Sequence, residues 1–129
     1  MAIKLNHTII QAKNAEKSAK FLCKILGLSA PTKFGPFVVV KTDNEVSLDF
    51  RTTTDQINPR HFAFIVSEKE FDEIFERITN RQLKYWADPG RTKSQQINHN
   101  DGGRGCYFLD LDGHFLEIIT RSYGGPASI

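Results

Sequence analysis

Two histidines and two carboxylates occupy corresponding places in the two halves of the sequence. His7 and His61 each lie in the first predicted strand of their half, and Asp49 and Glu117 each lie in the last one. Imidazole nitrogen and carboxylate oxygen are suitable ligands for a divalent ion of Fe, Mn, Ni, Co or Zn. A set of two histidines and one carboxylate leaves coordination positions open for a substrate. If a pseudo-twofold axis relates the two halves, all four side chains converge on one point, and we predict a metal site there.

The residues around Glu117 favour a special role for its carboxylate. Phe115, Glu117 and Ile119 share one face of a predicted strand, and burying an unpaired carboxylate among apolar side chains is costly. A metal cation would offset that cost. The alternatives are that Glu117 pairs with a nearby arginine, that each histidine is a hydrogen-bonded core residue, and that Asp49 belongs to a solvated face.

The elements that must position these residues follow one order, which begins with a strand and a helix and ends in strands. Asn14 is a plausible N-cap, and Gly27 supplies the stop of the first helix. The first half is predicted to contain a strand at 3–11, a helix from 15 to 26, a turn at 31–36, and strands at 37–41 and 45–51.

The same order begins again after a polar linker at 52–59. Ser67 and Glu70 fit a capping box at the start of the second helix. Neither half is large enough to bury a core alone, so we expect the two to pair around a shared cleft. The second half is predicted to contain a strand at 60–66, a helix after Ser67, a short strand at 84–86, a loop at 87–103, and strands at 105–110 and 114–120.

Further site candidates come from the loop at 87–103, which is long for a compact domain, and from aromatic residues. His99 is a candidate general acid or base, with a solvated loop histidine as the alternative. Arg104 is a candidate bidentate donor to a substrate carboxylate or phosphate, with a surface arginine as the alternative. Trp86 and Phe50 are candidates for an apolar substrate pocket, and core packing is their alternative.

Length and composition limit the class of protein. The chain has 129 residues, and 17 Lys and Arg against 15 Asp and Glu give a formal net charge of +2. This near balance gives no reason to expect nucleic acid or a membrane as a partner. No apolar run approaches the roughly 20 residues that cross a bilayer, and Cys23 and Cys106 form no CxxC site. We therefore expect a cytoplasmic protein.

Four segments resemble the vicinal oxygen chelate superfamily, which includes glyoxalase I, fosfomycin resistance proteins, methylmalonyl-CoA epimerase, extradiol dioxygenases and bleomycin resistance proteins. The segments are Leu5–Ile9, Phe21–Leu28, His61–Phe64 and, as the most specific, Cys106–Glu117. The resemblance implies an α+β fold in which two βαβββ modules form a U-shaped cleft of mixed sheets, usually in a homodimer.

The resemblance also implies roles for individual residues. It implies metal ligation by His7, His61 and Glu117. Tyr107 matches a catalytic tyrosine of the extradiol dioxygenases, and Asp49 stands where glyoxalase I has a further carboxylate. The stretch from 45 to 60 lacks the histidine that those dioxygenases carry before their second ligand, and Ile9 replaces a threonine of the fosfomycin enzymes.

These observations predict one domain over 1–129, with module one at about 1–55, module two at about 58–121 and a tail at 122–129. We expect a metal-dependent enzyme whose small, oxygen-rich substrate chelates the ion. Lyase, isomerase, thiol transferase and ring-cleaving dioxygenase chemistry all fit this scheme. The alternative is a non-catalytic protein that binds a small molecule or drug, as the bleomycin resistance proteins do.

Overall fold

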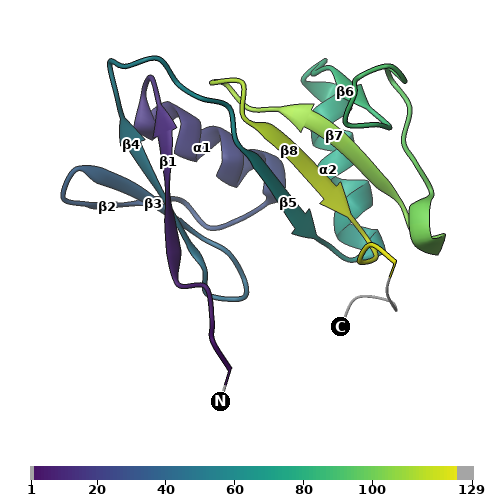
Figure 1. Cartoon of the computed structure of the whole chain (residues 1–129), viewed down its shortest axis with the longest axis horizontal. Helices are drawn as coiled ribbons and strands as arrows, with labels where there is room; N and C mark the ends of the chain where they lie inside the picture. Colours follow the sequence, from purple (N-terminus) through teal and green to yellow (C-terminus); the bar gives the residue numbers. More distant parts are fainter. Residues whose placement is uncertain (1, 125–129) are drawn as a thin grey trace. The chain divides into compact units, whose positions relative to one another are not determined.

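The described chain runs twice through the order strand, helix, three strands, and each copy forms a four-stranded mixed sheet with one helix (Figure 1). The computed structural model describes residues 2–124. It divides into two compact units, with the boundary between Asn58 and Pro59. The α+β class and the two βαβββ modules are therefore confirmed, and the end of the predicted tail, 125–129, lies outside the described residues.

The first unit has the strand order β1-β4-β3-β2, in which β1 and β4 are parallel and the other pairs are antiparallel. The predicted helix caps are both present. The Asn14 side chain accepts a hydrogen bond from the Lys17 amide, and Gly27 ends the helix at φ 75°. The elements are β1 (His7–Ala12), α1 (Ala15–Leu26), β2 (Thr32–Phe34), β3 (Phe37–Lys41) and β4 (Ser47–Thr52).

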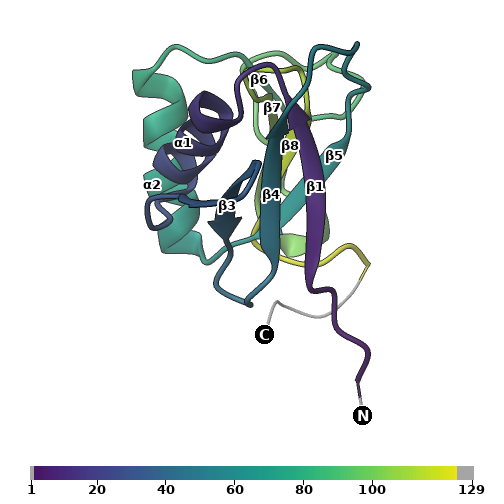
Figure 2. The same cartoon turned by 90° about the vertical axis from the view of Figure 1, so that its left-hand side faces the viewer.

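Helix α1 covers one face of the first sheet, where it contacts β3 and β4 (Figures 1 and 2). Val40, Leu48 and Phe50 are buried. Because side chains alternate along a strand, Asp49 lies on the opposite face from Leu48 and Phe50. The apolar alternation of β4 thus separates a packed face under α1 from a face that carries polar groups.

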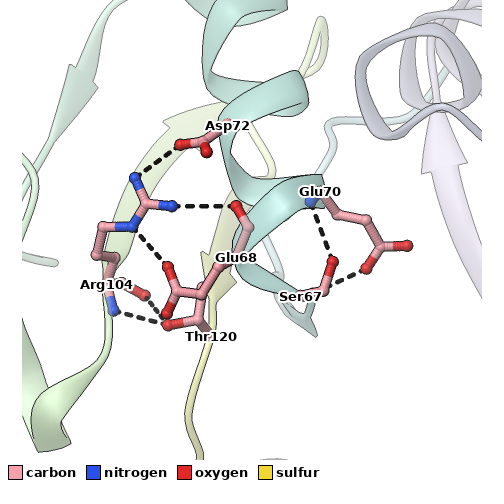
Figure 3. A network of polar contacts seen from close by, with 6 residues as sticks. All are labelled: Ser67, Glu68, Glu70, Asp72, Arg104 and Thr120. Atoms are coloured by element: carbon pink, nitrogen blue, oxygen red, sulfur yellow. Dashed lines mark hydrogen bonds and ion pairs between the residues drawn. The ribbon is translucent and has the colours of Figure 1, made fainter.

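The second unit repeats this plan with the strand order β5-β8-β7-β6. Its capping box is present: Ser67 Oγ accepts from the Glu70 amide, and Glu70 Oε1 accepts from the Ser67 amide (Figure 3). Neither helix in the described residues has the length and apolarity that a membrane crossing requires. The elements are β5 (His61–Ile65), α2 (Glu68–Asn80), β6 (Tyr85–Trp86), β7 (Gly105–Leu109) and β8 (Phe115–Ile119).

Most predicted strand ends lie within two residues of the observed ones, and two predictions differ more. The first strand begins at His7, which pairs with the first residue of β4, and not at Ile3. The predicted turn at 31–36 contains strand β2, which folds back on β3 through Gly35 at φ 58°. Both differences arise because strand length depends on the partner strand, which local sequence signals do not specify.

Candidate metal centre

The strand register places His61 and Glu117 on one face of the second sheet. Glu117 lies opposite Ala63 of β5 and Tyr107 of β7, and His61 lies opposite Phe115. Residues that face each other on paired strands project to the same side of a sheet, and residues two apart do so along one strand. The imidazole and the carboxylate therefore come from adjacent parallel strands and project together.

His61 and Glu117 approach each other closely enough for a proton or a metal ion to join them. His61 Nε2 lies 3.0 Å from Glu117 Oε1, and His61 Nδ1 lies 2.9 Å from the carbonyl oxygen of Phe115. A carbonyl only accepts hydrogen bonds, so Nδ1 carries a proton, and in the neutral ring Nε2 is a lone pair. Two acceptors would then face each other, so either a proton, on the ring or on the carboxyl, or a metal ion must lie between them.

Glu117 is held by the Tyr123 hydroxyl, which is itself hydrogen-bonded to Tyr107. Its side chain is 1% exposed, and the Tyr123 hydroxyl donates to Oε2. The hydroxyls of Tyr107 and Tyr123 lie 2.9 Å apart. Burial raises the pKa of both tyrosines, and the Glu117 carboxylate raises these pKa values as well, so both phenols stay protonated at neutral pH. Because Oε2 accepts from Tyr123, Oε1 is the carboxylate oxygen that is left to face His61.

This donor set fits a divalent metal. An imidazole that donates its other N–H to a backbone carbonyl is the usual form of a metal-ligating histidine. Cys106 lies opposite Ile118 and therefore projects to the other face of the sheet from Glu117, where burial, and then the Glu117 charge, raises the pKa of its thiol to about 12. Within residues 2–124, no group of three or more His, Cys, Asp and Glu side chains is placed to hold an ion. In the described residues, the His61–Glu117 pair offers two ligand atoms to a metal ion, Nε2 and Oε1.

The first unit repeats the same arrangement of a histidine and a carboxylate. Asp49 lies opposite Ile9, two residues beyond His7, just as Glu117 lies opposite Ala63, two residues beyond His61. His7 Nδ1 lies 2.8 Å from Asn6 Oδ1. Asp49 Oδ1 is buried and accepts no hydrogen bond from any described residue. A buried carboxylate oxygen without a donor is costly, so it too favours a cation or a donating ligand.

A cleft of about 490 Å³ on the first unit contains His7 and Asp49 in its wall. Apolar and cationic side chains make up much of the remainder, including Phe34, Phe37 and Lys41. This cleft has the size of a small-molecule site and combines apolar walls with a few polar groups.

One predicted substrate-binding residue, Phe50, lies in the core, and another, Trp86, lies beside Glu117. Phe50 is 1% exposed and lies on the α1 side of its sheet, so it is a core residue and does not line the cleft. Trp86 lies opposite Tyr107, in the same row as Glu117. His99 is exposed in the loop that precedes the 3₁₀ turn Asn100–Gly102.

Arg104 joins the second sheet to α2 (Figure 3). Its Nε donates to Glu68 at 2.7 Å, its Nη1 donates to Asp72 at 2.8 Å, and its guanidinium lies 4.4 Å from the centre of the Phe71 ring. The predicted role in substrate binding is replaced by this structural one, because three groups of α2 occupy the guanidinium. Arg104 was indistinguishable from a ligand-binding arginine in the sequence, since its partners lie more than 30 positions away.

We expect Arg104→Met to lower the free energy of unfolding by about 1 kcal/mol at pH 7, through lost ion pairs and ring contact. The Arg104 hydrogen bond holds the pKa of Glu68 below its usual value. Such a carboxyl adds stability above its unfolded pKa and loses it as pH falls through the folded one. Urea unfolding should therefore show a smaller difference in the free energy of unfolding between the wild type and Arg104→Met at pH 3 than at pH 7. Arg81→Met is the matched control, and an equal effect of both variants would contradict the prediction.

Two functional candidates escaped the sequence analysis. Tyr123 lies in the predicted tail, and nothing in its neighbourhood separates it from other tail residues. Arg91 lies in the long loop, where its guanidinium sits over the rings of Trp86 and Phe115. The only available signal was that this loop follows the single tryptophan of the chain.

The fold and the His–Glu pair define a class of protein. The profile of the Glyoxalase/Bleomycin resistance protein/Dioxygenase superfamily matches residues 4–118, and the chain belongs to this superfamily. Among solved structures it is similar to Oxidase ChaP-H1, with 57% identity and a TM-score of 0.94 over 96% of this chain and 100% of that chain. Oxidase ChaP-H2 is 52% identical, with a TM-score of 0.95 over 97% and 98%. Glutathione transferase FosA of Serratia marcescens is 27% identical over 124 residues, which are 92% of this chain and 81% of that protein.

Proposed function

We propose that this protein is a metal-dependent oxidase that acts on a small, oxygen-rich substrate, with His7, His61 and Glu117 as metal ligands. The observation that carries the proposal is the 3.0 Å approach of His61 Nε2 to Glu117 Oε1 while the Nδ1 proton is committed to a carbonyl. The repeated register of His7 supports its inclusion as the third ligand. Similarity to two proteins named oxidases, at 57% and 52% identity, supports the reaction class.

The chain's own residues would prepare the site for this chemistry. The Phe115 carbonyl fixes the tautomer of His61, and the Tyr123 hydroxyl leaves Glu117 Oε1 as the ligating oxygen. A bound divalent metal would supply Lewis-acid activation of substrate oxygens and a route for electrons to dioxygen. The Tyr107 hydroxyl donates to the Tyr123 oxygen, because the Tyr123 proton is committed to Glu117 Oε2. The proposed role of Tyr107 is to hold Tyr123 in place and to accept a hydrogen bond from a substrate hydroxyl. Asp49 Oδ1 and His99 are the proposed proton acceptors.

Thiol transfer is the second candidate, because FosA is also similar to this chain. The identity to FosA is 27%, about half of that to the two oxidases. Ile9 also replaces the threonine that the fosfomycin enzymes carry. We therefore favour the oxidase. The experiment described next distinguishes the oxidase from a non-catalytic protein that only binds a small molecule.

The test measures metal content and dioxygen uptake of protein purified without a histidine tag. We expect about one divalent ion per chain in the wild type, a large loss in His61→Ala and His7→Ala, and full retention in His99→Ala. The metal-loaded wild type should consume dioxygen in the presence of hydroxylated aromatic compounds, and His61→Ala should not. A full metal load in His61→Ala would refute the assigned ligands, and metal binding without dioxygen uptake would refute the oxidase.

Tyr123→Phe is expected to weaken metal binding about tenfold, because a residue that holds a metal ligand in place is typically worth 10- to 100-fold in affinity. The variant removes one hydroxyl and leaves Glu117 Oε2 without its donor. Affinity is measured by competition with a fluorescent chelator. Tyr85→Phe is the control, because Tyr85 packs its ring against Phe75, away from Glu117. Equal affinities of the Tyr123 variant and the wild type would contradict this role.

The cytoplasmic location, the homodimer and the shared cleft expected from the sequence stay predictions. Light scattering on the purified protein measures the oligomeric state directly.

A further inference from the structure

We infer that Arg91 binds the anionic group of an aromatic carboxylate substrate beside the His61–Glu117 pair. The inference names the substrate class of the proposed site and rests on the proposed function to that extent. It is carried by three features of the second unit: a wall of aromatic rings, a loop that holds Arg91 over that wall, and the absence of a carboxylate partner for Arg91 among the described residues.

The aromatic wall surrounds the His61–Glu117 pair on its own face of the sheet. The ring of Phe115 lies 5.8 Å from that of His61 and 5.2 Å from that of Tyr107, centre to centre. Trp86 extends the row that contains Tyr107 and Glu117. Ring faces at these spacings favour a further aromatic ring through stacked or edge contacts. Trp86 and Tyr107 are less than 10% exposed, whereas Phe115 is half-buried and His61 is exposed, so a flat, aromatic substrate would pack on Phe115 and His61, with the other two rings behind them.

Arg91 is held over this wall by a tight loop. Its guanidinium carbon lies 5.6 Å from the centre of the Phe115 ring and 5.9 Å from that of Trp86. The Asp88 carboxylate accepts hydrogen bonds from the amides of Thr92 and Lys93, and these bonds fix the loop on either side of Arg91. Arg91 itself has φ 58°, a conformation that non-glycine residues adopt at a cost of about 1–2 kcal/mol. The loop thus maintains an unfavourable backbone conformation at the residue that carries the cation.

The charge of Arg91 is available to a ligand. In the described part of the chain, Arg104 forms ion pairs with two carboxylates, whereas Arg91 forms none. A guanidinium that lies over a ring keeps its N–H donors in its own plane, where they match the two oxygens of a carboxylate. A ligand whose ring packs on the wall therefore finds a bidentate donor at the edge of the same wall.

The test compares 2-naphthoate with its uncharged isostere 2-naphthamide as probes of the metal-free full chain. We expect the wild type to prefer the naphthoate, and Arg91→Gln to weaken naphthoate binding about tenfold with naphthamide binding unchanged. Arg91→Lys keeps the positive charge but loses the bidentate guanidinium, so its affinity for naphthoate should fall between those of the wild type and Arg91→Gln. Calorimetry gives the dissociation constants, and the fluorescence of Trp86, the single tryptophan of the chain, reports whether the probe binds beside Arg91. Arg81→Gln is the matched control.

Each outcome decides between specific readings. An unchanged naphthoate preference in Arg91→Gln would overturn the inference, and so would an equal loss of both probes, because Arg91 would then act only by holding the loop. A wild type without the preference would overturn it as well. Metal content is measured on the same variants. A naphthoate preference that depends on Arg91 in a protein that binds no metal would uphold this inference and refute the proposed function.

Discussion

Glu117→Gln is expected to weaken divalent metal binding by at least about 100-fold, since removing a direct ligand costs more than removing the residue that orients it. The change keeps the shape of the side chain and removes its charge. Chelator competition on tag-free protein gives the affinity. Glu73→Gln, an exposed position on α2, is the control.

The same variant separates a metal ligand from a structural ion pair. In the metal-free protein, the new amide can donate to His61 Nε2, so the melting temperature should be no lower than that of the wild type. If His61 and Glu117 instead form a protonated ion pair, loss of the carboxylate charge lowers the melting temperature. Unchanged metal affinity with a lowered melting temperature would contradict the metal centre.

Phe50→Ala is expected to lower the free energy of unfolding by about 3–5 kcal/mol, the usual cost of truncating a buried phenylalanine. Phe50 is 1% exposed beneath α1. Phe34→Ala is the matched control in the same unit, because Phe34 is 74% exposed, and its loss should change stability by no more than about 0.5 kcal/mol. Urea unfolding measures both. A small effect at Phe50 would contradict its assignment to the core.

Helices were predictable where their ends carry local signals. Asn14 and Gly27 bracket α1, and the Ser67–Glu70 capping box opens α2, as their residue types indicate. Strand β2 was missed, because its three residues stand between prolines and take their conformation from pairing with β3. The start of β1 was placed too early for the same reason, since its partner β4 begins opposite His7.

The candidate site divides in a similar way. The repeat of a histidine and a carboxylate was visible because both modules use the same strand order and register. The role of Phe50 was not visible, because alternation assigns residues to a face without saying which face a helix covers. The role of Arg104 was not visible either, because its partners on α2 lie more than 30 positions away in the sequence. Tyr123 reaches Glu117 from a segment without periodicity, and only its hydrogen bond shows the connection.

The sequence by itself determined the order of the elements, the ends of both helices and the correspondence of His7 with His61 and of Asp49 with Glu117. Each of these depends on residues within one turn of helix or on a repeated spacing along the chain. Only the tertiary structure decided that the Phe115 carbonyl sets the tautomer of His61, that Tyr123 holds Glu117 and that Arg91 rather than Arg104 stands over the aromatic face. Those relations are contacts across the second sheet and its loops, and their energies depend on distances that no local pattern encodes.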